Sequence, residues 1–311
     1  MPFSSQEQKI IREIASLDQE EMISQIKEIS IAAWDGALEA LSVRSWLTNF
    51  SGEYLGNTNA ECILALWILE NYVYYTDRDV RAMTKNMWWK YLHFLLEEYE
   101  KDGFLAGSSF PEKVSYITEK TIIQPLGNCS GSGTNVAYFF RQTNRLDSSR
   151  FDLLNAEDYD YLVLVDDATL SGHQAKENLS RFDTIKDKRK IILTYISTER
   201  AKTYLGNNVT MLSSIDLDDR SRCFDDNSYV FRTYPEWKPI AKKMCEHYGQ
   251  KLDPRNPIGY RNGQFTFGFY YNIPNNSLPI FWGTLGGWVP LFTRYFGSEH
   301  NWEEADNEKF L

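Results

Sequence analysis

Apolar side chains recur at helical spacing along the first hundred residues of the chain. Ile10, Ile14 and Leu17 fall on one helical face, as in an amphipathic helix. The same spacing predicts further helices over residues 20–33, 37–50, 61–75 and 77–96. A glycine-containing loop then begins at Gly103. We therefore expect a helical N-terminal region over residues 1–108.

After this loop, short apolar runs alternate with helix-length stretches. The runs predict strands over residues 114–123, 161–165, 191–196 and 209–215. The stretches predict helices over residues 134–142, 172–182, 198–205 and 237–248. Wholly apolar strands separated by helices are typical of a parallel sheet covered on both faces. We expect an α/β core over residues 109–250, with ligands beyond the carboxyl ends of its strands.

The remaining residues, 251–311, form an irregular, aromatic-rich extension. Pro, Gly and Asn are frequent in it, and residues 264–271 predict a short buried strand. Trp282, Trp288 and Phe292 are too apolar for a solvated tail. We therefore expect the extension to pack on the core.

Composition limits the classes of function. The chain has 33 basic and 43 acidic residues and a net charge of −10, so it lacks a general attraction for nucleic acid phosphates. Local basic clusters leave direct nucleic-acid binding open. The four cysteines are scattered and show no zinc-binding spacing, as expected of free thiols in a reducing compartment. With no signal-peptide pattern and no long apolar stretch, we expect a cytoplasmic protein that does not enter membranes.

Residues 161–174, YLVLVDDATLSGHQ, carry the strongest chemical signal. An apolar strand ends in Asp166 and Asp167, and a turn and a helix follow. Gly172 would let the backbone approach a ligand, and the turn amides suit a phosphate. The carboxylates suit sugar hydroxyls, so the segment predicts a ribose 5-phosphate site. Its candidate phosphate-binding residues are Ala168, Thr169, Leu170, Ser171, Gly172, His173 and Gln174.

A second glycine-rich loop, over residues 125–134, precedes the predicted helix 134–142. It lacks the lysine of a P-loop and the third glycine of a dinucleotide-binding fingerprint. Its backbone amides are candidates for a pyrophosphate nest. The candidate residues are Gly127, Ser130, Gly131, Ser132, Gly133 and Thr134.

These two loops resemble those of the type I phosphoribosyltransferase superfamily. The usual phosphate turn is closer to Thr-Thr-Gly-Gly-Thr, from which Leu170 and His173 depart. The Ser-Gly-x-Gln ending and the stretch PNNSLPIFW over residues 274–282 are similar to a divergent bacterial subgroup associated with anti-phage defence genes. The resemblance covers roughly residues 110–290.

The resemblance implies a phosphoribosyltransferase-like core and a role for each loop. Asp166 and Asp167 would hold the ribose hydroxyls of phosphoribosyl pyrophosphate or a nucleotide, and act at the catalytic centre. The second loop would hold the pyrophosphate together with Mg²⁺, and no protein side chain is predicted as a metal ligand. Further candidate contacts are Arg222, Asn275 and Asn276.

The resemblance also implies an effector with a protein partner, such as a defence ATPase or a reverse-transcriptase complex. Superfamily members cover the site with a flexible hood between the two loops. Here residues 141–160 are available for it, which predicts a short or replaced hood. This favours glycosidic hydrolysis or an unusual acceptor over salvage of a free base.

Three other interpretations remain open. Asp166, Asp167 and Asp216 could form the acidic site of a phosphoacceptor receiver domain, although the Ser-Gly turn argues against it. The two neighbouring acids could simply cap a helix and face solvent. Finally, the same fold could sense a nucleotide and dock a partner without catalysis.

Overall fold

The computed structural model describes residues 3–127, 131–154, 156, 158–185 and 187–294. The predicted N-terminal helices form, and several begin at side-chain caps: Ser4 forms a capping box with Glu7, and Asp18 and Asn57 accept amides of the first helical turn. Their bounds are α1 (Ser5–Ala15), α2 (Gln19–Ala33), α3 (Ala40–Leu47) and α4 (Thr58–Glu70).

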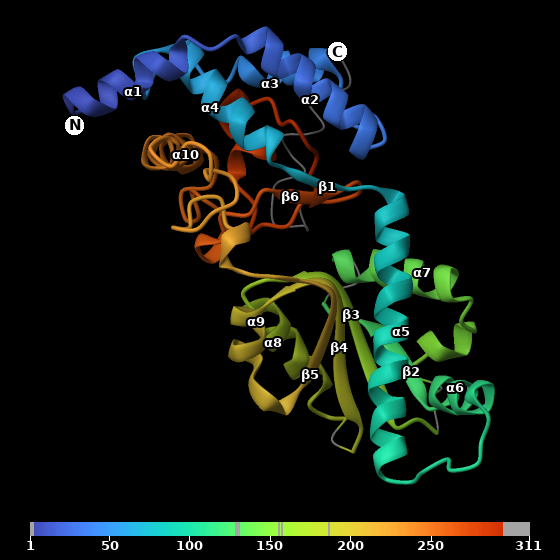
Figure 1. The fold of residues 1–311 in the computed structure, drawn as a ribbon. Coiled ribbons are helices and arrows are strands. Elements are labelled where there is room, and N and C mark those ends of the chain that lie inside the picture. Colours follow the sequence, from blue (N-terminus) through green and yellow to red (C-terminus); the bar gives the residue numbers. More distant parts are fainter. Residues whose placement is uncertain (1–2, 128–130, 155, 157, 186, 295–311) are drawn as a thin grey trace, which may run out of the picture.

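The helical lobe consists of α1–α4 together with α10 (Lys238–Leu252) (Figure 1). One hydrophobic cluster joins these helices to the later part of the extension, including Phe281 and Trp282. The indole Nε1 of Trp46 donates to the carbonyl of Ile280 at 2.8 Å. The extension is therefore part of this core, and not a tail on its surface.

The helix α5 (Asp77–Lys101) spans 25 residues and begins at a capping box between Thr76 and Asp79. Its buried side chains, among them Met87 and Tyr91, belong to the cluster of the main sheet. In Figure 1 it runs from the helical lobe down along the sheet. The apolar stripe predicted the helix, but the partner of that stripe is set by tertiary packing.

The main sheet has the order β2-β3-β4-β5, and every neighbouring pair is parallel. The predicted α/β class with a parallel sheet is thus confirmed. The helices α5 and α7 cover one face, and α8 and α9 cover the other (Figure 1). The strands are β2 (Thr121–Pro125), β3 (Tyr161–Thr169), β4 (Arg189–Thr198) and β5 (Thr210–Leu217). The helices are α6 (Phe110–Glu119), α7 (Ser132–Asn144), α8 (His173–Leu179) and α9 (Glu199–Leu205).

The strand predicted over residues 114–123 is wrong in its first half. Ser109 and Glu112 form a capping box, and Pro111 occupies the first turn, so the chain enters α6. The strand β2 begins at Thr121. An apolar run this short has no periodicity that separates helix from strand, and the cap decides.

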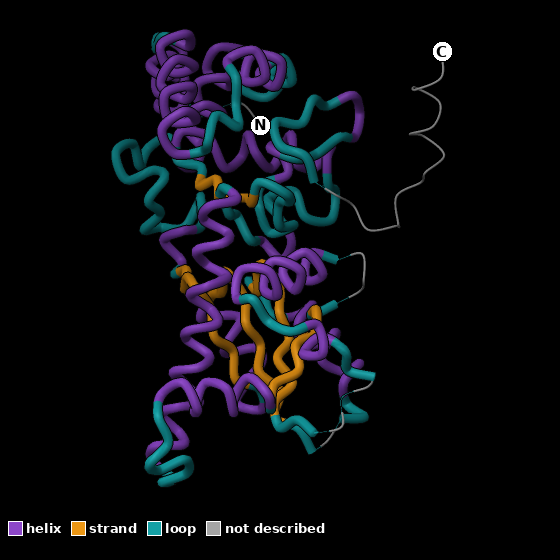
Figure 2. Tube along the Cα trace, turned by 90° about the vertical axis from the view of Figure 1, so that its right-hand side faces the viewer, coloured by secondary structure: helices purple, strands orange, loops and turns teal. Residues whose placement is uncertain are grey.

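A second, smaller sheet joins the helical lobe to the rest of the chain. The strand β1 (Val73–Tyr75) pairs in parallel with β6 (Phe267–Phe269). The helix predicted to reach residue 75 therefore ends at Glu70, and the strand predicted over residues 264–271 is shorter. Figure 2 shows this pair between the helical lobe and the main sheet. Within the described ranges, no helix has both the length and the apolarity that crossing a membrane requires.

Candidate functional site

The two acids predicted from the sequence, Asp166 and Asp167, lie near the carboxyl end of β3. The hydroxyl of Ser132, in the first turn of α7, lies 3.0 Å from Asp166 Oδ1 and 2.9 Å from Asp167 Oδ1. A hydroxyl has one proton, so the two carboxylates share this donor. The fold thus brings the pyrophosphate-type loop and the acidic pair together.

Both carboxylates are buried, with 8% of Asp166 and 5% of Asp167 exposed. Burial raises the pKa of Asp166, and the neighbouring charge of Asp167 raises it further. Burial also raises the pKa of Asp167, although Ser132 and the amide of Ala168 oppose the shift. A carboxylate held this way gains from any additional hydrogen-bond donor, such as a sugar hydroxyl.

Several buried polar atoms around this pair have no hydrogen-bond partner among the described residues. They are Asp167 Oδ2, Thr169 Oγ1, Tyr271 OH and Asn272 Oδ1. Asp167 and Thr169 project from the same face of β3, because side chains alternate along a strand. Burial raises the pKa of Tyr271, and the charge of Asp167 raises it further. Tyr271 and Asn272 were not predicted as site residues, although only Ile273 separates them from the Pro-Asn-Asn motif.

A cleft of about 270 Å³ opens at the carboxyl end of β3. Asp166 lines it, together with the turn residues Ala168, Thr169, Leu170, Ser171, Gly172 and Gln174. The opposite wall is Tyr260, Asn275 and Asn276 from the extension. Asn276 Nδ2 donates to the Tyr260 carbonyl at 2.9 Å, and Tyr260 N donates to the Asn275 carbonyl at 2.7 Å. We call this the sugar-phosphate cleft.

The turn after β3 has the geometry of an anion-binding loop. Gly172 adopts φ +75°, and a Cβ there would lie 3.0 Å from the Ala201 carbonyl oxygen and 3.1 Å from Tyr204 Cδ1. Within the described chain, the amides of residues 171–174 donate to no protein acceptor. The imidazole of His173 stacks on Tyr204 with centroids 3.9 Å apart and does not line the cleft. The His173 side chain therefore packs against the side of the turn that faces away from the cleft.

At Gly133, the glycine-rich loop brings the start of α7 close to β3. A Cβ on Gly133 would lie 2.9 Å from the Val165 carbonyl oxygen, so a larger residue would push the helix away. Gly131 caps α7, and the Gly127 carbonyl accepts from Arg181 Nη1 at 2.6 Å. Thr134 follows in the first turn, and Ser130 lies outside the described residues. The described part of this loop lines neither the sugar-phosphate cleft nor the second cleft beside it, which contains Arg222.

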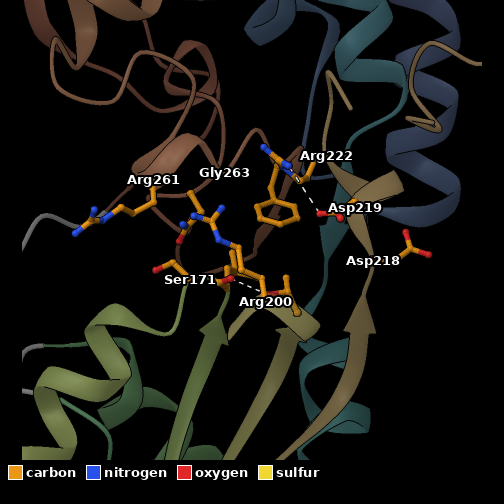
Figure 3. A pocket seen from close by; sticks show the side chains of 11 residues that line it. Ser171, Arg200, Asp218, Asp219, Arg222, Arg261 and Gly263 are labelled. Carbon is orange, nitrogen blue, oxygen red and sulfur yellow. Dashed lines mark hydrogen bonds and ion pairs between the residues drawn. The ribbon is translucent and has the colours of Figure 1, made fainter. Parts of the chain in front are cut away.

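Arg222 lies in a neighbouring cleft that shares Leu170, Ser171 and Asn276 with the first (Figure 3). Asp216, the third acid of the receiver interpretation, lines neither cleft. Burial raises its pKa, but hydrogen bonds from Lys202 and two serines outweigh this and lower it to about 2. Asp216 is thus engaged in its own network at the end of β5.

The described residues of the segment between the two loops do not line the sugar-phosphate cleft. Its short 3-10 helix, Ser148–Phe151, packs against β2, and Gln124 Nε2 donates to the Phe151 carbonyl at 2.9 Å. The wall opposite the turn comes instead from the extension.

Comparison with known proteins gives one assignment. No curated protein and no protein of solved structure matches the chain significantly. The family model described as PRTase-CE matches residues 43–294, which is well over half of the chain. The match spans α4, the main sheet, both loops and the described extension. The chain therefore belongs to the PRTase-CE family, and its α/β core is phosphoribosyltransferase-like.

Proposed function

We propose that the sugar-phosphate cleft binds phosphoribosyl pyrophosphate or a nucleotide, and that the protein breaks the bond at C1 of its ribose. One observation carries the proposal: a glycine turn with available amides shares a cleft with a buried carboxylate. Membership of a phosphoribosyltransferase-like family supports it.

The chemistry follows from the two kinds of group. The amides of residues 171–174 would bind the 5′-phosphate, because aligned backbone donors favour an anion. Asp166 and Asp167 would accept the ribose hydroxyls and oppose the positive charge that develops on the ring as the leaving group departs. Two contacts at opposite ends of the sugar also fix C1, and positioning contributes much of the rate.

Mg²⁺ would enter with the pyrophosphate and neutralise the leaving group. The residues fit such an ion: carboxylate and hydroxyl oxygens are its preferred ligands, and Asp167 Oδ2 is buried without a partner in the described chain. Ser132, Asp166 and Asp167 are the side chains that would hold the ion.

A binding experiment tests the donor site. Titration calorimetry with phosphoribosyl pyrophosphate and Mg²⁺ should show binding that Asp166→Asn weakens about tenfold or more, since a charged acceptor is lost. Asp158→Asn is the matched control, because Asp158 is exposed and pairs with Lys120 just before β3. Equal affinity in wild type and Asp166→Asn would contradict the proposal.

A turnover assay separates an enzyme from a sensor. The protein is mixed with phosphoribosyl pyrophosphate, NAD or nucleotides and Mg²⁺, and released pyrophosphate or base is measured. Turnover that disappears in Asp166→Asn supports the enzyme. Binding without turnover, with a partner present, supports a nucleotide-sensing module, which the lack of a hood over the cleft in the described residues favours.

The biological role that we propose is that of an effector in a bacterial phage-defence system. The stretch Pro274–Trp282 supports it through its similarity to defence-associated proteins, and its Asn275 and Asn276 line the cleft. The effector would act on a nucleotide pool or a nucleic acid end, and an ATPase or a reverse-transcriptase complex would be its partner. Plaque counts on bacteria that carry the wild-type system or Asp166→Asn test this role.

A further inference from the structure

A second cleft, of about 320 Å³, adjoins the sugar-phosphate cleft on its β4 and β5 side. Four segments form it, and one of them is the turn after β3, which contributes Leu170 and Ser171 (Figure 3). Thr198 and Arg200 lie where β4 meets α9, and Asp218, Asp219 and Arg222 follow β5. The extension adds Arg261, Gly263, Phe265 and Asn276. We call it the arginine cleft.

Two guanidinium groups in this cleft have N–H donors that no described acceptor satisfies. Arg200 is exposed and forms no ion pair with any described carboxylate. Arg222 donates from Nη2 to the Asn262 carbonyl at 3.0 Å, and its Nη1 lies 3.8 Å from Asp219. Its Nε is buried and has no acceptor in the described chain. An anion bound in the cleft would accept a hydrogen bond from this charged donor and remove the free-energy cost of leaving it unpaired.

The acids of the cleft compete weakly for these groups. Asp218 lines the cleft, but both of its carboxylate oxygens accept hydrogen bonds from Arg220. The Asp219 side chain is 77% exposed, and its contact with Arg222 is long. Arg261 extends away from the other two arginines at the rim. The interior of the cleft is therefore positively biased.

The backbone that shapes the cleft is held in costly conformations. Arg261, Asn262 and Gln264 have φ values of 55°, 59° and 62°. Such residues cost free energy unless the surrounding structure fixes them, and they concentrate at ligand sites. Gly263 fits because a Cβ there would lie 2.4 Å from the Asn276 carbonyl oxygen. The wall is thus preorganised and does not need a ligand to form.

We infer that the arginine cleft binds the phosphate group of a second, phosphate-bearing substrate, which accepts the ribosyl unit. Guanidinium groups bind phosphate through paired, charge-assisted hydrogen bonds. This inference rests on the proposed function. The order of the strands supports it, because the pyrophosphate-type loop follows β2 and the arginine cleft follows β4 and β5. The acceptor would then enter from the β4 and β5 side of the turn, and the leaving group would lie toward β2.

The reaction balances without another reagent. A nitrogen or oxygen of the acceptor forms a bond to C1. The bond between C1 and the pyrophosphate oxygen breaks, and its electron pair leaves with the pyrophosphate. The proton of the acceptor passes to water or to the departing pyrophosphate.

A two-ligand titration tests the inference. The full-length protein is saturated with phosphoribosyl pyrophosphate and Mg²⁺ and titrated with ATP, or with a single-stranded oligonucleotide bearing a 5′-phosphate or a 5′-hydroxyl. We expect ATP or the 5′-phosphorylated strand to bind alongside phosphoribosyl pyrophosphate. Arg200→Gln should weaken that binding roughly tenfold and change the affinity for phosphoribosyl pyrophosphate less than about twofold. Arg200 is exposed, so the variant should fold, and its melting temperature checks this.

Arg220→Gln is the control, because it removes the same charge from the neighbouring segment after β5, and Arg220 does not line the cleft. Binding of ATP alone identifies a free nucleotide as the acceptor class, and binding of the 5′-phosphorylated strand alone identifies a nucleic acid end. Competition with phosphoribosyl pyrophosphate, equal losses in the two variants, or binding of neither probe would overturn the inference. If phosphoribosyl pyrophosphate fails to bind while ATP binds in an Arg200-dependent way, the proposed function is wrong. The arginine cleft is then still supported as a phosphate-binding site.

Discussion

At the scale of single residues, ionisation of Asp166 favours ligand binding but lowers the stability of the fold. Its pKa is raised by burial and by Asp167, so the folded chain binds more protons than the unfolded chain between the ordinary pKa and the raised one. The free energy of unfolding therefore falls as pH rises through that interval. Affinity for a sugar hydroxyl should rise over the same interval, because the ionised form is the better acceptor.

We predict that Asp166→Asn raises the free energy of unfolding by about 1 kcal/mol at pH 8. The gain should disappear near pH 3, where Asp166 is neutral in both states. Urea unfolding at the two pH values measures it. Asp158→Asn should bring no such gain, because Lys120 lowers the pKa of Asp158. A destabilised Asp166→Asn at pH 8 would show that the carboxylate is not penalised by burial.

Gly172 offers a second test at this scale. Its φ of +75° disfavours a side chain, and a Cβ would push against the Ala201 carbonyl oxygen. Gly172→Ala should lower the free energy of unfolding by about 1–2 kcal/mol and abolish phosphate binding at the turn. Calorimetry with phosphoribosyl pyrophosphate measures the second effect. Gly206→Ala is the control: it also has positive φ, but a Cβ there meets no atom within 4 Å.

The sequence predicts the residues that lie together along the chain better than those that meet in space. An apolar run followed by two acids and a glycine turn identifies Asp166, Asp167 and Gly172 as one unit. Tyr271 and Arg200 carry no comparable signal, because a lone tyrosine or arginine is common on any surface. Their importance arises from tertiary contacts that bring the extension and the start of α9 to the end of β3.

At the scale of elements, Glu61 ties α4 to its neighbours. Its buried carboxylate accepts the amides of Gly52, Tyr54 and Leu55 at 2.8–2.9 Å and the Tyr248 hydroxyl at 2.5 Å. One side chain thus fixes the loop before α4 and the helix α10.

We predict that Glu61→Ala lowers the free energy of unfolding by about 3 kcal/mol or more, because several buried donors lose a charged acceptor. Tyr248→Phe should cost about 1–2 kcal/mol, since it removes one of these bonds and leaves the ring packed. Chemical denaturation of both variants gives the comparison. Glu97→Ala, on the exposed side of α5, should change little, and a similar loss there would refute the argument.

Helices and the main strands are predictable for a physical reason. Their apolar periods run over enough residues to identify the element, as in α5 and β3. The strands β1 and β6, which were not predicted with these bounds, have three residues each, and long-range pairing decides strands of that length. The other error falls on α6, which begins where a cap overrides an apolar run.

At the scale of the whole molecule, the extension belongs to two cores at once. Phe265, Phe267 and Phe269 pack with the main sheet, and Ile273 to Phe292 contribute to the helical lobe. The sequence predicts that the extension packs, because its aromatic residues are too many for solvent. It does not predict that this segment joins two clusters, since no local pattern encodes a partner.

We predict that Phe281→Ala lowers the free energy of unfolding by about 3–5 kcal/mol, because this fully buried ring stacks on Trp46 and contacts Tyr72. It should also weaken the binding of phosphoribosyl pyrophosphate, since the same segment carries Asn275 and Asn276. Thermal unfolding and calorimetry measure the two effects. Leu285→Ala nearby is 52% exposed and should alter neither, and a loss in stability without a loss in affinity would separate the two roles.

The bond from Trp46 to Ile280 has a consequence for regulation. A protein that bound α1–α4 and moved them would strain the short stretch of chain between Ile280 and the cleft-lining asparagines. Thermodynamic linkage then makes the effect mutual: whatever factor that protein imposes on nucleotide affinity, the nucleotide imposes on its attachment. A chain built this way can report an occupied cleft to a partner on its far end without any separate signalling domain.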